Sequence, residues 1–68
     1  MLDTKVAIVL TYLKEYFKVN SKPIEVVNIN INGLTSNDIL EAIDTLDNLG
    51  YLNRDNKYIS SPIESINS

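Results

Sequence analysis

The chain contains neither cysteine nor histidine, and these two absences remove several kinds of site at once. Without cysteine there is no disulfide framework and no thiolate zinc site. Without histidine, the usual general base and the commonest metal ligand are both missing. The lack of cysteine is compatible with a reducing compartment, and we expect an intracellular, cytoplasmic protein.

Glycine and proline are scarce, with two of each, and long apolar runs are absent. Gly33 and Gly50 do not form a phosphate-cradling loop, and each has a structural role in a turn or a helix cap. No run approaches the roughly 18 apolar residues of a membrane span, and the N-terminus lacks a secretory signal pattern. We therefore expect a soluble chain with no membrane partner.

The 68 residues, 44% of them apolar, are enough for one small domain, which we place at residues 1–60. A core of this size gives only a few kcal/mol of stability, so a homodimer stays open. Residues 61–68 contain proline and serine without periodicity, and we expect a disordered tail. Docking of Ile63 and Ile66 on the body is the less favoured alternative.

The clearest helix signal runs from Leu34 to Gly50. Thr35 and Asp38 have the spacing of a capping box, and Leu34 stands where it can pack on Ile39. Gly50 ends the helix because glycine takes the left-handed conformation easily. The spacing predicts a helix over 35–49 whose apolar face comprises Ile39, Ile43, Leu46 and Leu49, flanked by Leu40 and Ala42.

Two short strands are predicted after this helix, at 51–54 and 57–60. Asp55 and Asn56 between them tolerate positive φ, as a tight hairpin turn requires. Tyr51, directly after the glycine, stands where it can fold back on Leu46.

An earlier helix is predicted over 3–19, capped by Asp3 or Thr4. Its apolar stripe comprises Val6, Val9, Leu10, Leu13, Tyr16 and Phe17. Ile8 and Tyr12 lie beside this stripe, four residues apart, and form a small apolar patch. They are either two ordinary exposed residues or a surface for self-association or a partner.

The segment 24–31, a strand or a short helix, follows a break at Pro23. Residues 27–32 alternate β-branched side chains with asparagine, which is typical of a half-buried strand. Ile24, Val27 and Ile31 would also suit one or two helical turns. We favour a strand that pairs with the hairpin to give a three-stranded sheet.

The order of helix, Leu49-Gly50-Tyr51-Leu52 and hairpin resembles the second half of a winged helix-turn-helix domain. In that family a helix ending in Leu-Gly-Tyr-(Ile or Leu) runs into a two-stranded wing. The resemblance implies an α+β, winged-helix-like domain in the order α-β-α-β-β. The chain departs from the family at 24–32, where asparagines replace a second helix. The fold does not identify the partner, since it serves DNA binding in some proteins and protein docking in others.

The side chains that could take part in catalysis are limited to carboxylates, tyrosines and hydroxyls. Asp38, Glu41 and Asp44 sweep across the helix surface instead of converging, so they suit a solvated acidic face better than a metal site. No serine or threonine has a histidine partner. We predict no enzymatic activity, no metal and no cofactor.

The resemblance offers DNA-binding transcriptional regulation as one function, with the central helix in the major groove and the protein acting as a dimer. The net charge of −3 disfavours it, and no lysine or arginine occurs from Ile24 to Asn53. Charge contact would depend on Lys14 and Lys18 of the first helix, Lys22 of the following loop, and Arg54 and Lys57 of the wing. On the central helix, Asn37 is suited to reading adenine.

We favour instead a protein-interaction or regulatory module. An acidic central helix beside an apolar patch would attract a protein partner of basic character. The residues assigned to this surface are Ile8, Tyr12, Glu41, Asp44, Asn48 and Tyr58.

Overall fold

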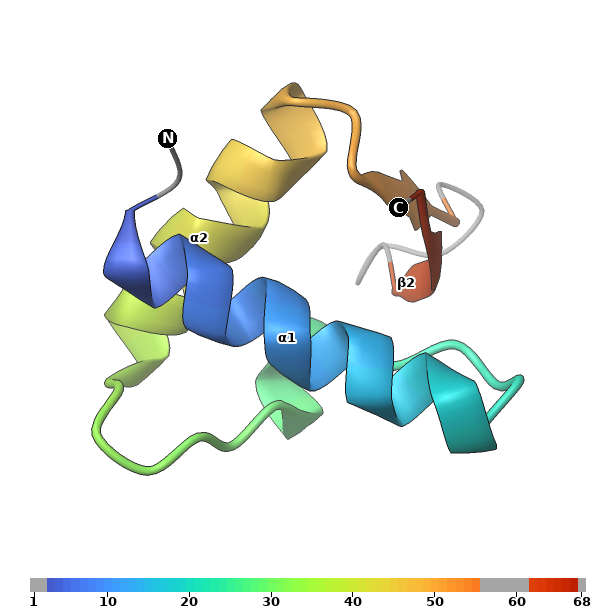
Figure 1. Ribbon diagram of the computed structural model, residues 1–68, viewed down its shortest axis with the longest axis horizontal. Coiled ribbons are helices and arrows are strands. Elements are labelled where there is room, and N and C mark those ends of the chain that lie inside the picture. Colours follow the sequence, from blue (N-terminus) through green and yellow to red (C-terminus); the bar gives the residue numbers. More distant parts are fainter. Residues whose placement is uncertain (1–2, 56–61, 68) are drawn as a thin grey trace.

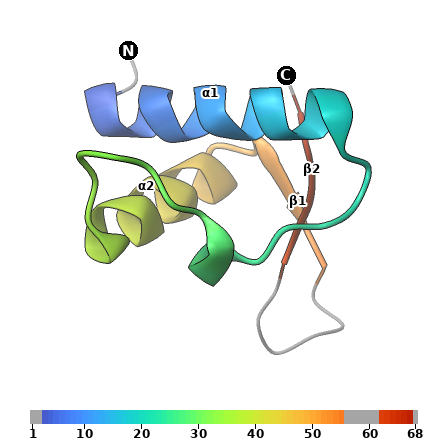
Figure 2. The same ribbon diagram turned by 90° about the horizontal axis from the view of Figure 1, so that it is seen from below.

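A computed structural model describes residues 3–55 and 62–67 of the chain. Its elements are helix α1 (Thr4–Val19), the 3₁₀ helix η1 (Val26–Asn28), helix α2 (Ser36–Asn48), and strands β1 (Leu52–Arg54) and β2 (Ile63–Ile66). The described part is a small α+β domain with two α-helices and a two-stranded antiparallel hairpin. Figure 1 shows α1 crossing α2, and Figure 2 shows α1 as one layer above α2 and the hairpin.

Helix α1 buries the stripe that its sequence predicts. Val6, Val9, Leu10 and Leu13 are buried in the core, and Tyr16 and Phe17 pack against it. The helix contacts both α2 and β2, so this stripe closes the core over both of them. Asp3 occupies the N-cap but its side chain makes no capping hydrogen bond, so the predicted side-chain cap of this helix is wrong for Asp3.

Both ends of α2 are built as the sequence predicts. Thr35 Oγ1 accepts the Asp38 N–H at 3.1 Å, and Asp38 Oδ2 accepts the Thr35 N–H at 3.1 Å. At the other end Gly50 has φ +82°, while Tyr51 N–H donates to Leu46 O at 2.9 Å. The capping box and the glycine cap are therefore confirmed.

The core-facing side of α2 is narrower than predicted. Ile39, Ala42, Ile43 and Leu46 are buried. Leu49 is 56% exposed, because it is the C-cap residue at the edge of this face and the chain turns away into β1 directly after it. Leu40, on the other flank, is 51% exposed.

The segment 24–31 forms one bridge and one 3₁₀ turn, so the favoured strand and its three-stranded sheet are wrong: within the described residues the sheet has two strands, β1 and β2, and Ile24 joins it by a single bridge. Ile24 and Ile63 exchange two backbone hydrogen bonds. The chain then turns into η1, which places Val26 and Ile29 on one side because residues three apart eclipse in a 3₁₀ helix. Both are buried, whereas Val27 between them is 79% exposed. Of the alternative, one short helical turn does form, but Val27, one of the three residues on which that alternative was based, is exposed.

The partner of β1 is β2 and not the predicted strand 57–60. The register pairs Leu52 with Ile66, Asn53 with Ser65, and Arg54 with Ile63. Asp55 N–H donates to Pro62 O at 2.9 Å, so the hairpin closes across these two residues. Residues 57–60, and Asn56 of the predicted tight turn, lie outside the described residues.

The predicted disordered tail is wrong for residues 62–67. Ile63 has no exposed surface and belongs to the core, and Pro62 is also buried. The Asn67 side chain donates to Gly50 O at 3.1 Å and accepts from Asn53 Nδ2 at 2.8 Å. Apolar burial and these hydrogen bonds order a segment whose serines and proline favour disorder.

Candidate functional site

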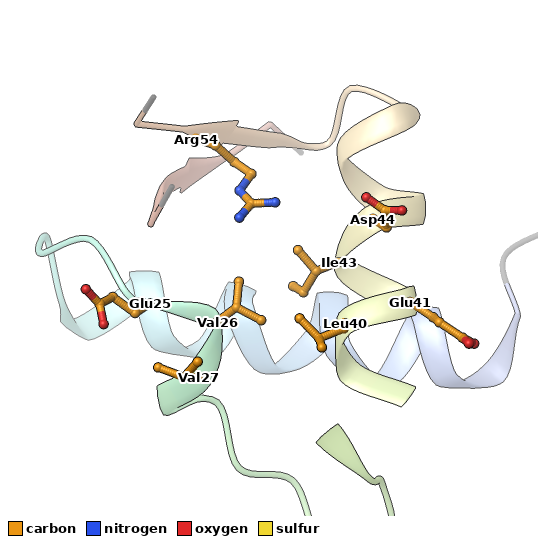
Figure 3. Close-up of a pocket in the computed structure, with 8 residues that line it drawn as sticks. All are labelled: Glu25, Val26, Val27, Leu40, Glu41, Ile43, Asp44 and Arg54. Atoms are coloured by element: carbon orange, nitrogen blue, oxygen red, sulfur yellow. The ribbon is translucent and has the colours of Figure 1, made fainter. Parts of the chain in front are cut away.

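A groove opens between η1 and α2 on one side of the domain. It has a volume of about 430 Å³, and its lining residues are Glu25, Val26 and Val27 from the η1 segment, Leu40, Glu41, Ile43 and Asp44 from α2, and Arg54 from β1. Figure 3 shows Val26, Leu40 and Ile43 pointing toward one another across it. We call this surface the η1–α2 groove.

A smaller hollow of about 130 Å³ adjoins the groove. It shares Val26, Val27 and Leu40 with the groove and adds Ile29, Asn30, Ser36 and Ile39. Because three lining residues are common to both, the two hollows form one elongated surface. Its floor is mostly apolar.

Val27 and Leu40 give the groove its exposed apolar surface. They are 79% and 51% exposed, although each adjoins a buried core residue, Val26 and Ile39 respectively. The 3₁₀ turn directs Val27 outward, and the position of Leu40 on the flank of α2 does the same. Because the core fixes both backbones, the two side chains are held ready for contact.

The carboxylates on the outward side of α2 have different environments. Asp38 pairs with Lys5, with Nζ and Oδ1 2.9 Å apart, and Asp47 Oδ2 lies 4.0 Å from Arg54 Nη1. Glu41 and Asp44 between them are exposed and make no ion pair with any described residue. Lys5 attracts Glu41 only through a weaker Coulomb interaction, so the middle of the acidic face, next to Leu40, is compensated less than its ends.

The Lys5–Asp38 pair changes the titration of both groups. The hydrogen bond from Lys5 lowers the pKa of Asp38 below its ordinary value of 3.8, and the Thr35 backbone N–H lowers it further. The same side-chain hydrogen bond, with the Coulomb attraction of Asp38, raises the pKa of Lys5 above 10.5. The contact links the first turns of α1 and α2.

Arg54 is the one basic side chain among the residues that line the groove. Its guanidinium points into the groove from β1, as Figure 3 shows, and the side chain is only 20% exposed. Its proximity to Asp47 offsets part of its charge. The lining thus carries three carboxylates and one guanidinium.

Two of the residues predicted for a protein-interaction surface, Glu41 and Asp44, line the groove. Asn48 is exposed at the end of α2, outside the groove. Ile8 is exposed on α1, whereas Tyr12 is partly buried against the core, and neither lines the groove. Tyr58 lies outside the described residues.

The residues of the DNA-binding alternative are more dispersed. Lys14, Lys18, Lys22 and Asn37 are exposed. Lys18 Nζ lies 3.2 Å from Glu15 Oε1, and Arg54 lies beside Asp47. Lys57 falls outside the described residues.

Sequence reasoning missed three of the four apolar residues that line the groove, Val26, Val27 and Leu40; the fourth, Ile43, was predicted as part of the apolar face of α2. The signal available was the Val26-Val27 dipeptide, since adjacent side chains of a strand point to opposite faces. Two neighbouring branched residues beside a polar stretch therefore indicate that one of them is exposed or that the strand is broken. In the structure Val27 is exposed, and a 3₁₀ turn replaces the strand.

Within residues 3–55 and 62–67 no group of three or more carboxylates lies close enough to hold a metal ion. No helix in this part of the chain has the length and apolar character that crossing a bilayer requires. No protein-family model, curated protein or solved structure matches this chain. The groove itself is lined by apolar side chains with charged groups at its edge, and such a surface suits noncovalent binding.

Proposed function

We propose that this protein is a non-enzymatic interaction module that docks a segment of a partner protein in the η1–α2 groove. The observation that carries the proposal is the exposure of Val27 and Leu40, which line the groove beside the buried Val26 and Ile43. Their exposure leaves apolar surface in water, and a partner that covers it would gain the free energy of burial.

A winged-helix-like architecture is part of the proposal. It is supported by the position of β2 between β1 and Ile24, and by the glycine cap that leads α2 into the hairpin. The short helix η1 stands where the resemblance implies a second helix. Because η1 is a single turn, it leaves the adjacent side of α2 open to solvent. Residues of the η1 segment then form one wall of the groove.

The charges favour protein docking over the DNA alternative. In the DNA-binding form of the family, the outward side of α2 would approach the phosphates. That side carries Glu41 and Asp44, which would repel a duplex with about one negative charge per 1.7 Å of its axis. The guanidinium of Arg54, the one arginine in the sequence, lies beside the Asp47 carboxylate.

The proposal is tested by selecting peptides from a displayed random library against the immobilised full chain, and then comparing two variants. Leu40→Lys alters the groove, and Leu49→Lys makes the same change at a similarly exposed leucine outside it. We expect the selected peptides to lose at least tenfold in affinity for Leu40→Lys and to bind Leu49→Lys like the wild type. Melting curves confirm first that both variants fold.

A fluorescent 30-base-pair duplex supplies the competing outcome. We expect no binding at low salt, and micromolar, salt-sensitive binding would return the DNA-regulator hypothesis to first place. Peptides that bind both leucine variants alike would show that the groove is not the docking surface.

A further inference from the structure

The groove also indicates what kind of segment it accepts. We infer that its occupant is a short basic amphipathic segment of another protein, with an aliphatic side chain on the apolar floor and a lysine or arginine beside α2. This inference rests on the proposed docking function and specifies the chemistry of the partner.

The apolar half of the inference comes from the lining. Val26 and Ile43 are buried and form the floor, and the more exposed Val27 and Leu40 also belong to the lining. The smaller hollow continues this surface toward Ile39. An aliphatic side chain fits such a floor, whereas a polar one would lose its water without gaining a hydrogen-bond partner.

The charged half comes from Glu41 and Asp44. They lie three residues apart on α2, so their side chains are neighbours on the helix surface next to Leu40. Neither makes an ion pair with a described residue: Lys5 pairs with Asp38 and attracts Glu41 only through a weaker Coulomb interaction, and Arg54 lies beside Asp47. A cation on the partner would meet two carboxylates within one helical turn.

A second copy of this chain fits the groove less well. Each copy carries a formal charge of −3, so two copies repel each other. The exposed side of α1 offers Lys14, but Lys18 is already paired with Glu15. Charge complementarity therefore favours a different, basic protein.

The test compares what the library yields against three forms of the full chain. One is the wild type, and one is the double variant Glu41→Lys/Asp44→Lys. The control is Glu15→Lys/Glu64→Lys, which makes the same change in net charge at two exposed glutamates outside the groove. Melting curves are recorded for each form before selection.

We expect wild-type selections to be enriched in sequences that combine lysine or arginine with leucine, isoleucine or valine. Synthetic versions of these peptides should lose at least tenfold in affinity for the groove double variant and less than threefold for the control. Selection against the groove double variant should yield acidic peptides instead. Binding of the wild type should weaken as salt rises, because rim charges set the salt dependence of association.

The inference and the proposed function fail in different ways. Peptides that depend on Leu40 but show no basic bias would leave the groove a docking site and overturn the inference about its occupant. Peptides that do not depend on Leu40 would overturn both. Self-association in sedimentation that Val27→Asp abolishes, and Val19→Asp does not, would assign the groove to a second copy and overturn the basic partner.

Discussion

Ile24 and Ile63 exchange two backbone hydrogen bonds, with N to O distances of 3.0 and 2.8 Å, although they come from segments far apart in the sequence. The bridge ties the residues that lead into η1 to the last strand of the chain. One wall of the groove begins with Glu25, directly after this bridge. The position of the candidate site therefore depends on the C-terminal strand.

Replacing Ile63 by alanine should lower the free energy of unfolding by about 2–5 kcal/mol, because the side chain is fully buried and leaves a cavity. Urea denaturation followed by circular dichroism measures the loss. Val19→Ala, at an 81% exposed site, should change stability by less than about 0.5 kcal/mol. Equal stability of the two variants would mean that residues 62–67 are not part of the core.

Gly50→Ala should cost about 1–2 kcal/mol of stability through the backbone alone. Gly50 has φ +82°, where an L side chain is strained, yet no atom lies within 4 Å of the position of an added Cβ. Asn48→Ala, at the exposed last residue of α2, is the matched control and should be close to neutral. A loss no larger than that of the control would argue against the left-handed cap.

The Lys5–Asp38 pair predicts how stability depends on pH. Asp38 has a lowered pKa in the folded state, so its contribution is present above its ordinary value of 3.8 and is lost as pH falls through the folded value. Lys5 has a raised pKa, so its contribution is present below 10.5 and is lost as pH rises through the folded value. The stability difference between the wild type and Asp38→Ala should therefore be constant near neutral pH and shrink in acid.

Thr35→Ala serves as the control for this pH dependence. It removes the hydroxyl that caps α2 and should cost about 1 kcal/mol, since the hydroxyl accepts the Asp38 N–H. Because threonine does not titrate and the Asp38 N–H needs its cap at every pH, most of this cost should persist in acid; only the minor share by which the Thr35 hydroxyl lowers the pKa of Asp38 is lost. Denaturant midpoints across the acid range measure both differences, and an Asp38→Ala cost that is unchanged in acid would contradict the lowered pKa.

Local signals predicted the helices well. The stripe of α1, the Thr35–Asp38 capping box and the Gly50 cap each depend on neighbours within a few residues, and each occurs in the structure. Strand pairing depends instead on contacts between distant segments. Tyr58 and Ile59 suggested a second strand by their residue types, but Ile63 is the residue that β1 and Ile24 enclose.

The sequence predicted charged residues of the candidate site but not its exposed apolar residues. Glu41 and Asp44 were identified because charge can be read from sequence, and both line the groove. Val27 was assigned to a buried strand face because it alternates with the asparagines that follow it. The 3₁₀ turn instead buries Val26 and Ile29 and exposes Val27. The Val26-Val27 dipeptide indicates that one of the two valines is exposed or the strand is broken, but it does not identify which of these occurs.

The most direct test of groove docking is a ¹H–¹⁵N correlation spectrum of the full chain, titrated with a synthetic peptide from the wild-type selection. We predict that the largest shift changes occur at residues 25–29, 39–44 and 54, and that Leu40→Lys removes them. Shift changes centred on Ile8 and Tyr12 of α1, with residues 25–29 unaffected, would contradict it and move the docking surface to the first helix.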